Sequence, residues 1–473
     1  MSPNTLRSAA EQVATQRTSS QQLVEQAWAA AETWDPLIGV YNSRFRESSY
    51  IAAERADQLA AQGGPLGALH GVPIAVKDLL ATRDGATTAQ SLVLDTRWGD
   101  GAEGSAVARL RKAGAIVLGK TTTMEFGVGT PDATKPFPMP RNPWDRGRYA
   151  GGSSSGNASG IAAGLFLGAV GTDTAASIRW PATFCGVSGL KPTFGWVPKS
   201  RLVPLAFSLD HIGPMARTAD DCALMLEVMS GHDASDPDSA PRPRFSARTA
   251  DERTDLQGLR IGVAAMADVA AEHRDPDVTA CFDTAVEVLR RLGAETRRVA
   301  LPHYEEACTA TIITLISEGG AYHAQNLRHR WEEFSEGARG VFGLAPFITG
   351  VDYVQAQRVR RRTQLALREL FASVDVVVMP TAGIAAVSLD DAGEVALGPK
   401  WPAMYTPYWN AVGNPAASVP MGFNAEGLPL GLQLAAAPFN DAEVLRVADA
   451  YQATTDWHLR TPPQATHDDT EHP

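Results

Sequence analysis

The stretch Gly151–Thr193 reads GGSSSGNASGIAAGLFLGAVGTDTAASIRWPATFCGVSGLKPT, and the rest of the chain is interpreted outward from it. It has the highest density of glycine and hydroxyl residues in the sequence, and an apolar run at 161–170 separates two such clusters. Small residues let backbone amides approach a ligand closely, and a serine beside a base can act as a nucleophile. A flexible Gly/Ser linker would not contain the apolar run. The stretch therefore predicts a catalytic or binding core.

Two short motifs match the sequence in this region but lack the context that each requires. Residues 152–156, GSSSG, fit the nucleophile elbow G-x-S-x-G, which directly follows a β-strand. The preceding residues, 142–149, read NPWDRGRY and predict a loop. Residues 114–121, GAIVLGKT, fit the phosphate-binding pattern G-x-x-x-x-G-K-[ST], but their centre is an apolar strand pattern instead of an exposed loop. Neither an α/β-hydrolase elbow nor a nucleotide site is expected.

A longer, ordered set of motifs covers most of the chain and resembles the amidase signature family of serine hydrolases. The motifs are GVPIAVKD (71–78), GGSSSG (151–156), GTDTAASIRWPA (171–182), GLKPT (189–193), SLDHIGPMART (208–218), NPAASVPMGF (414–423) and GLPLGLQL (427–434). The resemblance extends from about Leu23 to Leu445. It implies an α/β fold in which helices cover both faces of a central, twisted, mixed β-sheet. It also implies an amide hydrolase related to fatty acid amide hydrolase and to the A subunit of glutamyl-tRNA(Gln) amidotransferase.

The family uses a lysine, a bridging serine and a nucleophilic serine, and this sequence matches all of them. The resemblance assigns Lys77 as the base, Ser153 as the bridge and Ser177 as the nucleophile. A serine hydroxyl needs a base to remove its proton, and a lysine can act as that base only when it is uncharged. Lys77 follows the apolar run 72–76, which predicts a buried strand, and burial lowers the pKa of a lysine. Ser153 would pass the proton onward and return it to the leaving amine.

The resemblance also assigns backbone N–H donors for the oxyanion, directly around the nucleophile. They belong to Thr174, Ala175, Ala176 and Ser177. The usual family pattern has Gly-Gly in place of Ala175-Ala176, and alanine costs on the order of 1 kcal/mol wherever φ must be positive. The added methyl groups would narrow the floor of the pocket. Asp173 and Arg179 flank the nucleophile with opposite charges, and we expect them to brace the loop rather than to bind a substrate carboxylate.

The residues near these motifs favour an apolar or aryl substrate. Trp180 occupies a position where the A subunit of the amidotransferases commonly has glutamine, and a glutamine substrate would call for polar contacts. Aromatic and apolar pocket walls favour apolar or aryl groups. The expected substrate-binding residues are Met124, Tyr149, Trp180, Phe207, Tyr405 and Trp409.

The expected function is therefore hydrolysis of the C–N bond of a small amide, aryl or apolar on one side, through an acyl-enzyme on Ser177. The alternatives are a glutamine-hydrolysing subunit of the amidotransferase A type, and an esterase or carbamate hydrolase that uses the same residues. A panel of amides, esters and carbamates would separate them.

Composition restricts the partners of this 473-residue chain. Its net charge of −11 argues against a nucleic-acid backbone as partner. The N-terminus has no apolar segment of the signal-peptide type, and no apolar run reaches membrane-spanning length. The four cysteines lack C-x-x-C spacing, and the histidines form no metal motif. We expect a cytoplasmic enzyme without metal or cofactor, with a small-molecule amide as its partner and a homodimer as an allowed state.

Apolar patterns also outline the domain organisation. Strand patterns at 71–76 and 115–118 alternate with a helix pattern at 105–113, which indicates a sheet between two layers of helices. Residues 1–460 are expected to form one amidase domain. That domain would include an N-terminal helical layer at about 1–65 and an exposed linker at about 230–254. Residues 461–473, rich in Pro and Asp, are expected to be disordered.

Overall fold

The computed structural model describes residues 5–246 and 255–464, and a large mixed sheet lies at its centre. The expectations for 247–254 in the linker and for 465–473 in the tail lie outside the described residues. The strands are β1 (Tyr41–Arg44), β2 (Pro73–Lys77), β3 (Ile116–Thr121), β4 (Gly168–Asp173), β5 (Ser188–Lys191), β6 (His211–Ala216), β7 (Arg260–Val263), β8 (Glu295–Arg298), β9 (Val376–Pro380), β10 (Ala416–Phe423) and β11 (Pro429–Ala436).

Within the described residues these strands form one eleven-stranded sheet in the order β1-β3-β2-β4-β6-β5-β10-β11-β9-β7-β8. β2 runs parallel to β3 and β4, and β7 runs parallel to β8 and β9. The pairings from β4 to β9 in that order are antiparallel. The sheet is therefore mixed, as the sequence predicts, and the parallel neighbours β2 and β4 end on the same side of it.

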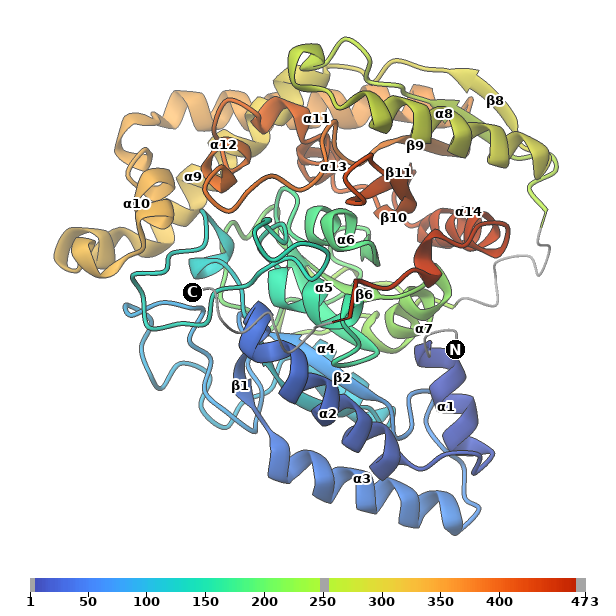
Figure 1. Cartoon of the computed structure of the whole chain (residues 1–473). Helices are drawn as coiled ribbons and strands as arrows, with labels where there is room; N and C mark the ends of the chain where they lie inside the picture. The colour runs from blue at the N-terminus through green and yellow to red at the C-terminus, as the bar shows by residue number, and fades with distance from the viewer. Residues whose placement is uncertain (1–4, 247–254, 465–473) are drawn as a thin grey trace.

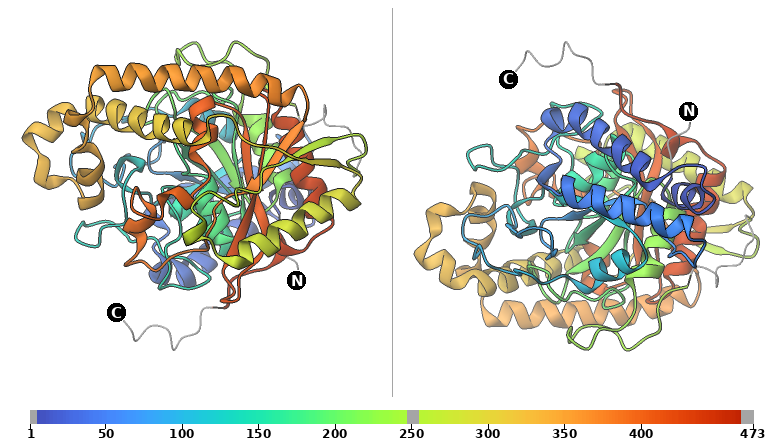
Figure 2. Two further views of the ribbon diagram at one scale, coloured as in Figure 1. Left: turned by 90° about the horizontal axis from the view of Figure 1, so that it is seen from above. Right: turned by 90° about the horizontal axis from the view of Figure 1, so that it is seen from below.

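Helices cover both faces of this sheet, as the two views in Figure 2 show. They are α1 (Leu6–Ala14), α2 (Ser20–Ile38), α3 (Arg46–Ala61), α4 (Ser105–Lys112), α5 (Ser155–Ala162), α6 (Arg179–Cys185), α7 (Ala219–Met229), α8 (Pro276–Arg291), α9 (Tyr304–His329), α10 (Glu336–Phe342), α11 (Gly350–Phe371), α12 (Ala392–Val395), α13 (Pro407–Val412) and α14 (Asp441–Ala453). Figure 1 labels them, with α1 to α3 on one side of the molecule and α9 to α11 on the other. No helix in the described ranges is both long enough and apolar enough to cross a membrane.

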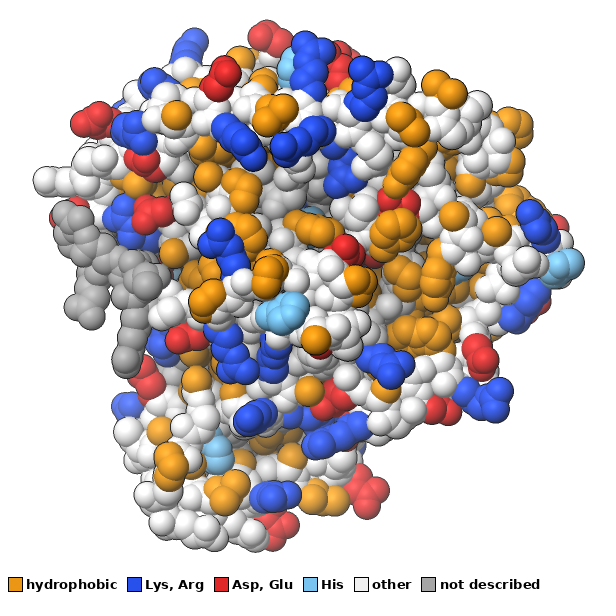
Figure 3. All heavy atoms as spheres, turned by 180° about the vertical axis from the view of Figure 1, so that it is seen from behind, with side chains coloured by type: hydrophobic (Ala, Val, Ile, Leu, Met, Phe, Trp, Pro, Cys, Tyr) orange, Lys and Arg blue, Asp and Glu red, His pale blue; other side chains and the backbone are white. Residues whose placement is uncertain are grey.

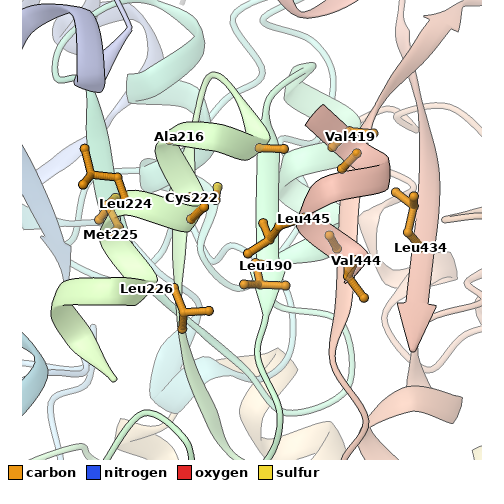
Figure 4. Close-up of a cluster of buried hydrophobic side chains, with 14 of the residues drawn as sticks. Leu190, Ala216, Cys222, Leu224, Met225, Leu226, Val419, Leu434, Val444 and Leu445 are labelled. Carbon is orange, nitrogen blue, oxygen red and sulfur yellow. The ribbon is translucent and has the colours of Figure 1, made fainter. Parts of the chain in front are cut away.

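Two main hydrophobic clusters hold these layers together. One packs α1, α4, α7, α8 and α14 against the sheet, and Figure 4 shows part of it between β5, β6, β10, β11, α7 and α14. The other packs α2, α5 and α6 against the opposite face. In β2, Ile74 and Val76 belong to the first cluster and Ala75 to the second. Because side chains alternate along a strand, Lys77 shares the face of Ala75, on which α5 lies.

The expected N-terminal helical layer is built from α1, α2 and α3. A capping box formed by Ser19 and Gln22 starts α2, and Gly39 in the left-handed conformation ends it. No sequence pattern indicated β1, which follows α2 and pairs antiparallel with β3 at the edge of the sheet. Because β1 lies between α2 and α3 in the chain, it attaches the N-terminal helical layer to the central sheet.

Residues 230–246, expected to form part of an exposed linker, are exposed along much of their length but are anchored to the body. Ser230 and Phe245 are buried, and the Trp196 indole N–H donates to the Pro243 carbonyl over 3.0 Å. The rings of Trp196 and Phe245 meet edge-on, with centroids 5.5 Å apart. A polar composition predicts exposure, but it does not reveal that one aromatic side chain docks the segment.

On the outer surface, basic and acidic side chains are intermixed with apolar ones on the face shown in Figure 3.

Candidate active site

Lys77 is the last residue of β2, and its side chain is completely buried. Its Nζ lies 2.7 Å from Ser153 Oγ and 2.8 Å from Thr172 Oγ1. Burial lowers the pKa of Lys77 to about 7, although the nearby carboxylates of Asp173 and Asp210 favour the charged form. A large share of this amine is therefore uncharged near neutral pH, so it can accept a proton.

The loop that carries Ser153 is tied to the strand beside Lys77. A cis peptide bond joins Gly152 to Ser153, directly before α5. The Ser154 hydroxyl donates to the Thr172 carbonyl over 3.2 Å, and the Ser154 N–H donates to the Ser177 carbonyl over 3.1 Å. These bonds hold the loop against the end of β4. They place the loop that carries Ser153 beside both Lys77 and the segment that contains Ser177.

Residues 174–177 connect β4 to α6 and line a cavity together with Ser153. Within the described part of the chain, the backbone N–H groups of these four residues have no acceptor, and the Ser177 hydroxyl makes no hydrogen bond. Free donors beside a free hydroxyl can stabilise a developing oxyanion. Neither Ala175 nor Ala176 has a positive φ, so alanine brings no backbone strain here. Both residues line the cavity.

Asp173 and Arg179 form a fully buried pair at the base of this segment. Arg179 Nε and Nη2 each lie 2.9 Å from a carboxylate oxygen of Asp173. Arg179 Nη1 donates to the Thr406 carbonyl over 2.9 Å and to Gln433 Oε1 over 2.8 Å. Burial alone would raise the pKa of Asp173, but the guanidinium of Arg179 holds it below its ordinary value. The guanidinium is fully engaged, which supports its expected bracing role over a substrate clamp.

The cavity beside Ser177 is small and mostly apolar, with a volume of about 60 Å³. Among the described residues, no Asp, Glu, Lys or Arg side chain lines it. The lining consists of Met124, Gly127, Val128, Gly129, Tyr149, Gly152, Ser153, Thr174, Ala175, Ala176, Ser177, Trp180, Leu205, Leu315, Val341, Ala396, Leu397 and Trp401. Three of the expected substrate-binding residues, Met124, Tyr149 and Trp180, are among them.

The other three expected substrate-binding residues lie outside this cavity. Phe207 is 56% exposed and borders a different surface groove. Tyr405 and Trp409 are buried in a core cluster with Met379, where the Tyr405 hydroxyl donates to the Val269 carbonyl over 3.0 Å. Aromatic residues near a motif can pack into the core as readily as into a pocket, and the local sequence does not distinguish the two.

Several lining residues were not expected, because they come from segments far from the motifs. Leu315 lies in α9, Val341 in α10, and Leu397 in the loop after α12. Trp401 meets Trp180 edge-on, with ring centroids 5.2 Å apart. Trp401 is the exception, because the aromatic cluster at 401–409 in the sequence points to it as a pocket residue.

No cluster of three or more His, Cys, Asp or Glu side chains that could hold a metal ion occurs in residues 5–246 or 255–464. All four cysteines are free thiols. Cys185 lies close to Ser177 in the sequence. Burial raises the pKa of this thiol to about 12, so it stays protonated at neutral pH and is a poor nucleophile.

Comparisons with known proteins match most of this chain to amidases and to amidotransferase A subunits. Residues 22–445 match the family model for amidases. The A subunit of glutamyl-tRNA(Gln) amidotransferase from Gloeobacter violaceus is 36% identical over 479 aligned positions, which cover 95% of this chain and 96% of the relative.

Two solved structures are similar over nearly their whole length. One, described as a vestigial protein complex that reveals the origins of an s-triazine catabolic enzyme, has a TM-score of 0.88 and 32% identity, covering 95% of this chain and 98% of that chain. The other, a bacterial aryl acylamidase of the amidase signature family, has a TM-score of 0.86 and 25% identity, covering 97% of this chain and 98% of that chain.

Proposed function

The chain belongs to the amidase family, and from this membership we propose that it hydrolyses small, uncharged amides through an acyl-enzyme on Ser177. One observation carries the proposal. The buried amine of Lys77 lies 2.7 Å from Ser153 Oγ. The loop that carries Ser153 is hydrogen-bonded to the Ser177 segment, in which the N–H groups of 174–177 have no acceptor among the described residues. We assign Lys77 as the base, Ser153 as the relay and Ser177 as the nucleophile.

Acylation begins when Ser177 Oγ attacks the carbonyl carbon of the amide. Its proton passes to Ser153 Oγ, whose own proton moves to the uncharged Lys77 Nζ. The carbonyl oxygen becomes an oxyanion and accepts hydrogen bonds from the N–H groups of residues 174–177. Each such donor typically contributes about 3 kcal/mol to the stability of the transition state.

The tetrahedral intermediate then collapses. The C–N bond breaks, the leaving nitrogen takes a proton from Ser153, and Lys77 returns a proton to Ser153. A water molecule next attacks the acyl-enzyme and gives its proton through Ser153 to Lys77. The second tetrahedral intermediate expels Ser177, which recovers a proton by the same route, and the carboxylic acid leaves.

The cavity supports an uncharged substrate with an aryl or apolar part. Its walls come from Met124, Leu205, Leu315, Val341 and the Trp180–Trp401 pair, and none of its described lining residues carries a charge. Apolar walls with few polar groups favour aryl and alkyl groups. The similarity to an aryl acylamidase agrees with this substrate class.

A second candidate function is glutamine hydrolysis as the A-type component of an amidotransferase. The curated relatives favour it, because relatives 34–38% identical are named as the A subunit of glutamyl-tRNA(Gln) amidotransferase. In that case the chain would work within a larger enzyme. The cavity argues against it, since glutamine brings an ammonium and a carboxylate that need polar partners, and the described cavity walls carry no charged side chain.

The test uses the purified full-length chain. A fluorophosphonate is expected to label Ser177 in intact-mass and peptide-mapping experiments, and the S177A variant is expected to remain unlabelled. An amide panel that includes an anilide, a primary aryl amide and glutamine then separates the two functions. Hydrolysis of the first two without glutamate release supports the proposal, whereas glutamate release alone supports the amidotransferase function. An unlabelled Ser177 would overturn the assigned mechanism for both.

A further inference from the structure

Tyr149 carries a hydroxyl that has no hydrogen-bond partner among the described residues, although its side chain is only 1% exposed. The residue lines the cavity in front of Ser177, and its backbone N–H is fixed by the Val387 carbonyl over 2.8 Å. The hydroxyl is not one of the fully enclosed polar atoms that lack a partner, so it keeps accessible surface where Tyr149 lines the cavity. The orphan hydroxyl therefore points to a partner that arrives with the ligand.

The position of this hydroxyl is defined by Gly152. A methyl group added at Gly152 would come within 2.2 Å of Tyr149 Oη and 3.3 Å of Met124 Cγ. The hydroxyl thus lies over the peptide that leads into Ser153, at the wall of the cavity. Burial raises the pKa of Tyr149 above its usual range, so the group stays protonated and can donate.

Trp180, which lines the same cavity as Tyr149, carries a second hydrogen-bond donor without a partner among the described residues. The indole N–H of Trp180 is buried without an acceptor in the described part of the chain, and its ring packs against Trp401. The carbonyl oxygen of the scissile amide has its own donors in residues 174–177, as proposed above. Neither Tyr149 nor Trp180 is needed for that oxygen. A further acceptor is required to satisfy them.

We propose that the Tyr149 hydroxyl donates a hydrogen bond to a second carbonyl oxygen of the substrate, close to the scissile amide. Tyr149 is then the residue that selects keto-amides or diacyl compounds over plain alkyl amides of the same shape. The inference rests on the proposed function, and it narrows the substrate from any small apolar amide to one with a second carbonyl group.

The experiment compares pairs of amides of similar shape in which the ketone oxygen of one member is replaced by a methyl group and a hydrogen in the other. On the acyl side the pair is 3-oxobutanamide and 3-methylbutanamide. On the amine side it is N-(2-oxopropyl)acetamide and N-isobutylacetamide. Each amide competes with fluorophosphonate labelling of Ser177, so the concentration that halves the labelling rate reports occupancy of the cavity without requiring turnover.

In the Y149F variant, we expect protection by one carbonyl-bearing amide to weaken about 3- to 10-fold, while its alkyl partner changes less than twofold. The pair that responds identifies the side of the substrate that Tyr149 contacts. The matched control is Y41F, which removes a buried hydroxyl that lies outside the cavity and has no partner among the described residues, and it should leave every ratio unchanged. The thermal midpoint of Y149F should not fall below that of the parent, because no internal hydrogen bond is lost.

Equal changes for both members of both pairs, or no change at all, would overturn the role of Tyr149 while the acyl-enzyme mechanism stands. Failure of the fluorophosphonate to label Ser177 in the parent chain would instead remove the proposed function on which the inference depends. The two failures are thus distinguishable in a single set of labelling curves.

Discussion

At the residue scale, the chemistry depends on how completely Lys77 is removed from water. Its amine is fully buried and donates to Ser153 and Thr172. Substitution by methionine keeps the length and apolar stem of the side chain but removes the base. We expect K77M to lower kcat/KM for amides by about 10²- to 10⁴-fold, the usual contribution of a general base. Steady-state hydrolysis measures the loss, and unfolding curves must show that the variant stays folded. Near-normal turnover would rule out Lys77 as the base.

The same burial predicts how activity depends on pH. Because the pKa of Lys77 is lowered to about 7, the amine is uncharged above that pH and protonated below it. The rate kcat/KM should therefore rise with pH through about 7 and reach a plateau above it. On the acid side it should fall about tenfold per pH unit. The rate of Ser177 labelling by a fluorophosphonate should follow the same curve. A profile that is flat from well below to well above this pKa would contradict the assignment.

The residues that motifs identified and those that they missed differ in a physical way. The family resemblance singled out Lys77, Ser153 and Ser177, and in the structure Lys77 contacts Ser153 while both serines line one cavity; their catalytic roles are the proposal made above. Tyr405 and Trp409 were wrongly expected in the cavity, since both fill a core around Met379. Hydrophobicity records that an aromatic side chain is buried, but the surface against which it packs depends on the tertiary fold.

At the element scale, α5 and α6 frame the site, and neither was expected from the sequence. α5 reads SGNASGIA and α6 reads RWPATFC, so both lack the apolar periodicity that reveals a helix. Other elements, such as β2, β3, α4 and α7, carry clear apolar patterns and could be placed. The short helices instead depend on tertiary bonds, and the main one is the Asp173–Arg179 pair.

That pair gives a prediction about stability. R179M would leave the Asp173 carboxylate buried without its guanidinium, and loss of one partner of a buried pair typically costs about 3–5 kcal/mol. We expect the free energy of unfolding, measured with urea, to fall by this amount. The double variant with D173N should recover part of it, because no buried charge remains. The control is R290Q, which breaks an exposed pair with Glu287 and should cost below about 1 kcal/mol. Equal effects for the two single variants would contradict the bracing role.

At the scale of the whole molecule, the site joins parts of the chain that lie far apart in sequence. The sheet places β2 beside β4, which brings Lys77 within reach of Thr172. The C-terminal half then adds lining residues to the cavity from α9, α10 and the loop that carries Leu397. The mixed sheet was predictable from alternating strand and helix patterns together with the family resemblance. The cavity wall was not, because it depends on how distant helices pack.

This separation between the reacting groups and the distant wall predicts that substrate range can be changed without altering the chemistry. Val341 in α10 lines the cavity and is 5% exposed, so V341A would enlarge the cavity that Ser177 also lines. We expect kcat/KM to shift several-fold toward bulkier acyl groups, while a small fluorophosphonate labels Ser177 at the parent rate. V286A makes the same change in α8, where Val286 packs in the core cluster that includes α7 and α14. Both variants should lose about 1–3 kcal/mol of stability, but only V341A should change the preference for acyl size. An equal shift in both would show that selectivity follows general loosening of the fold, and the distant wall would then have no specific part in choosing the substrate.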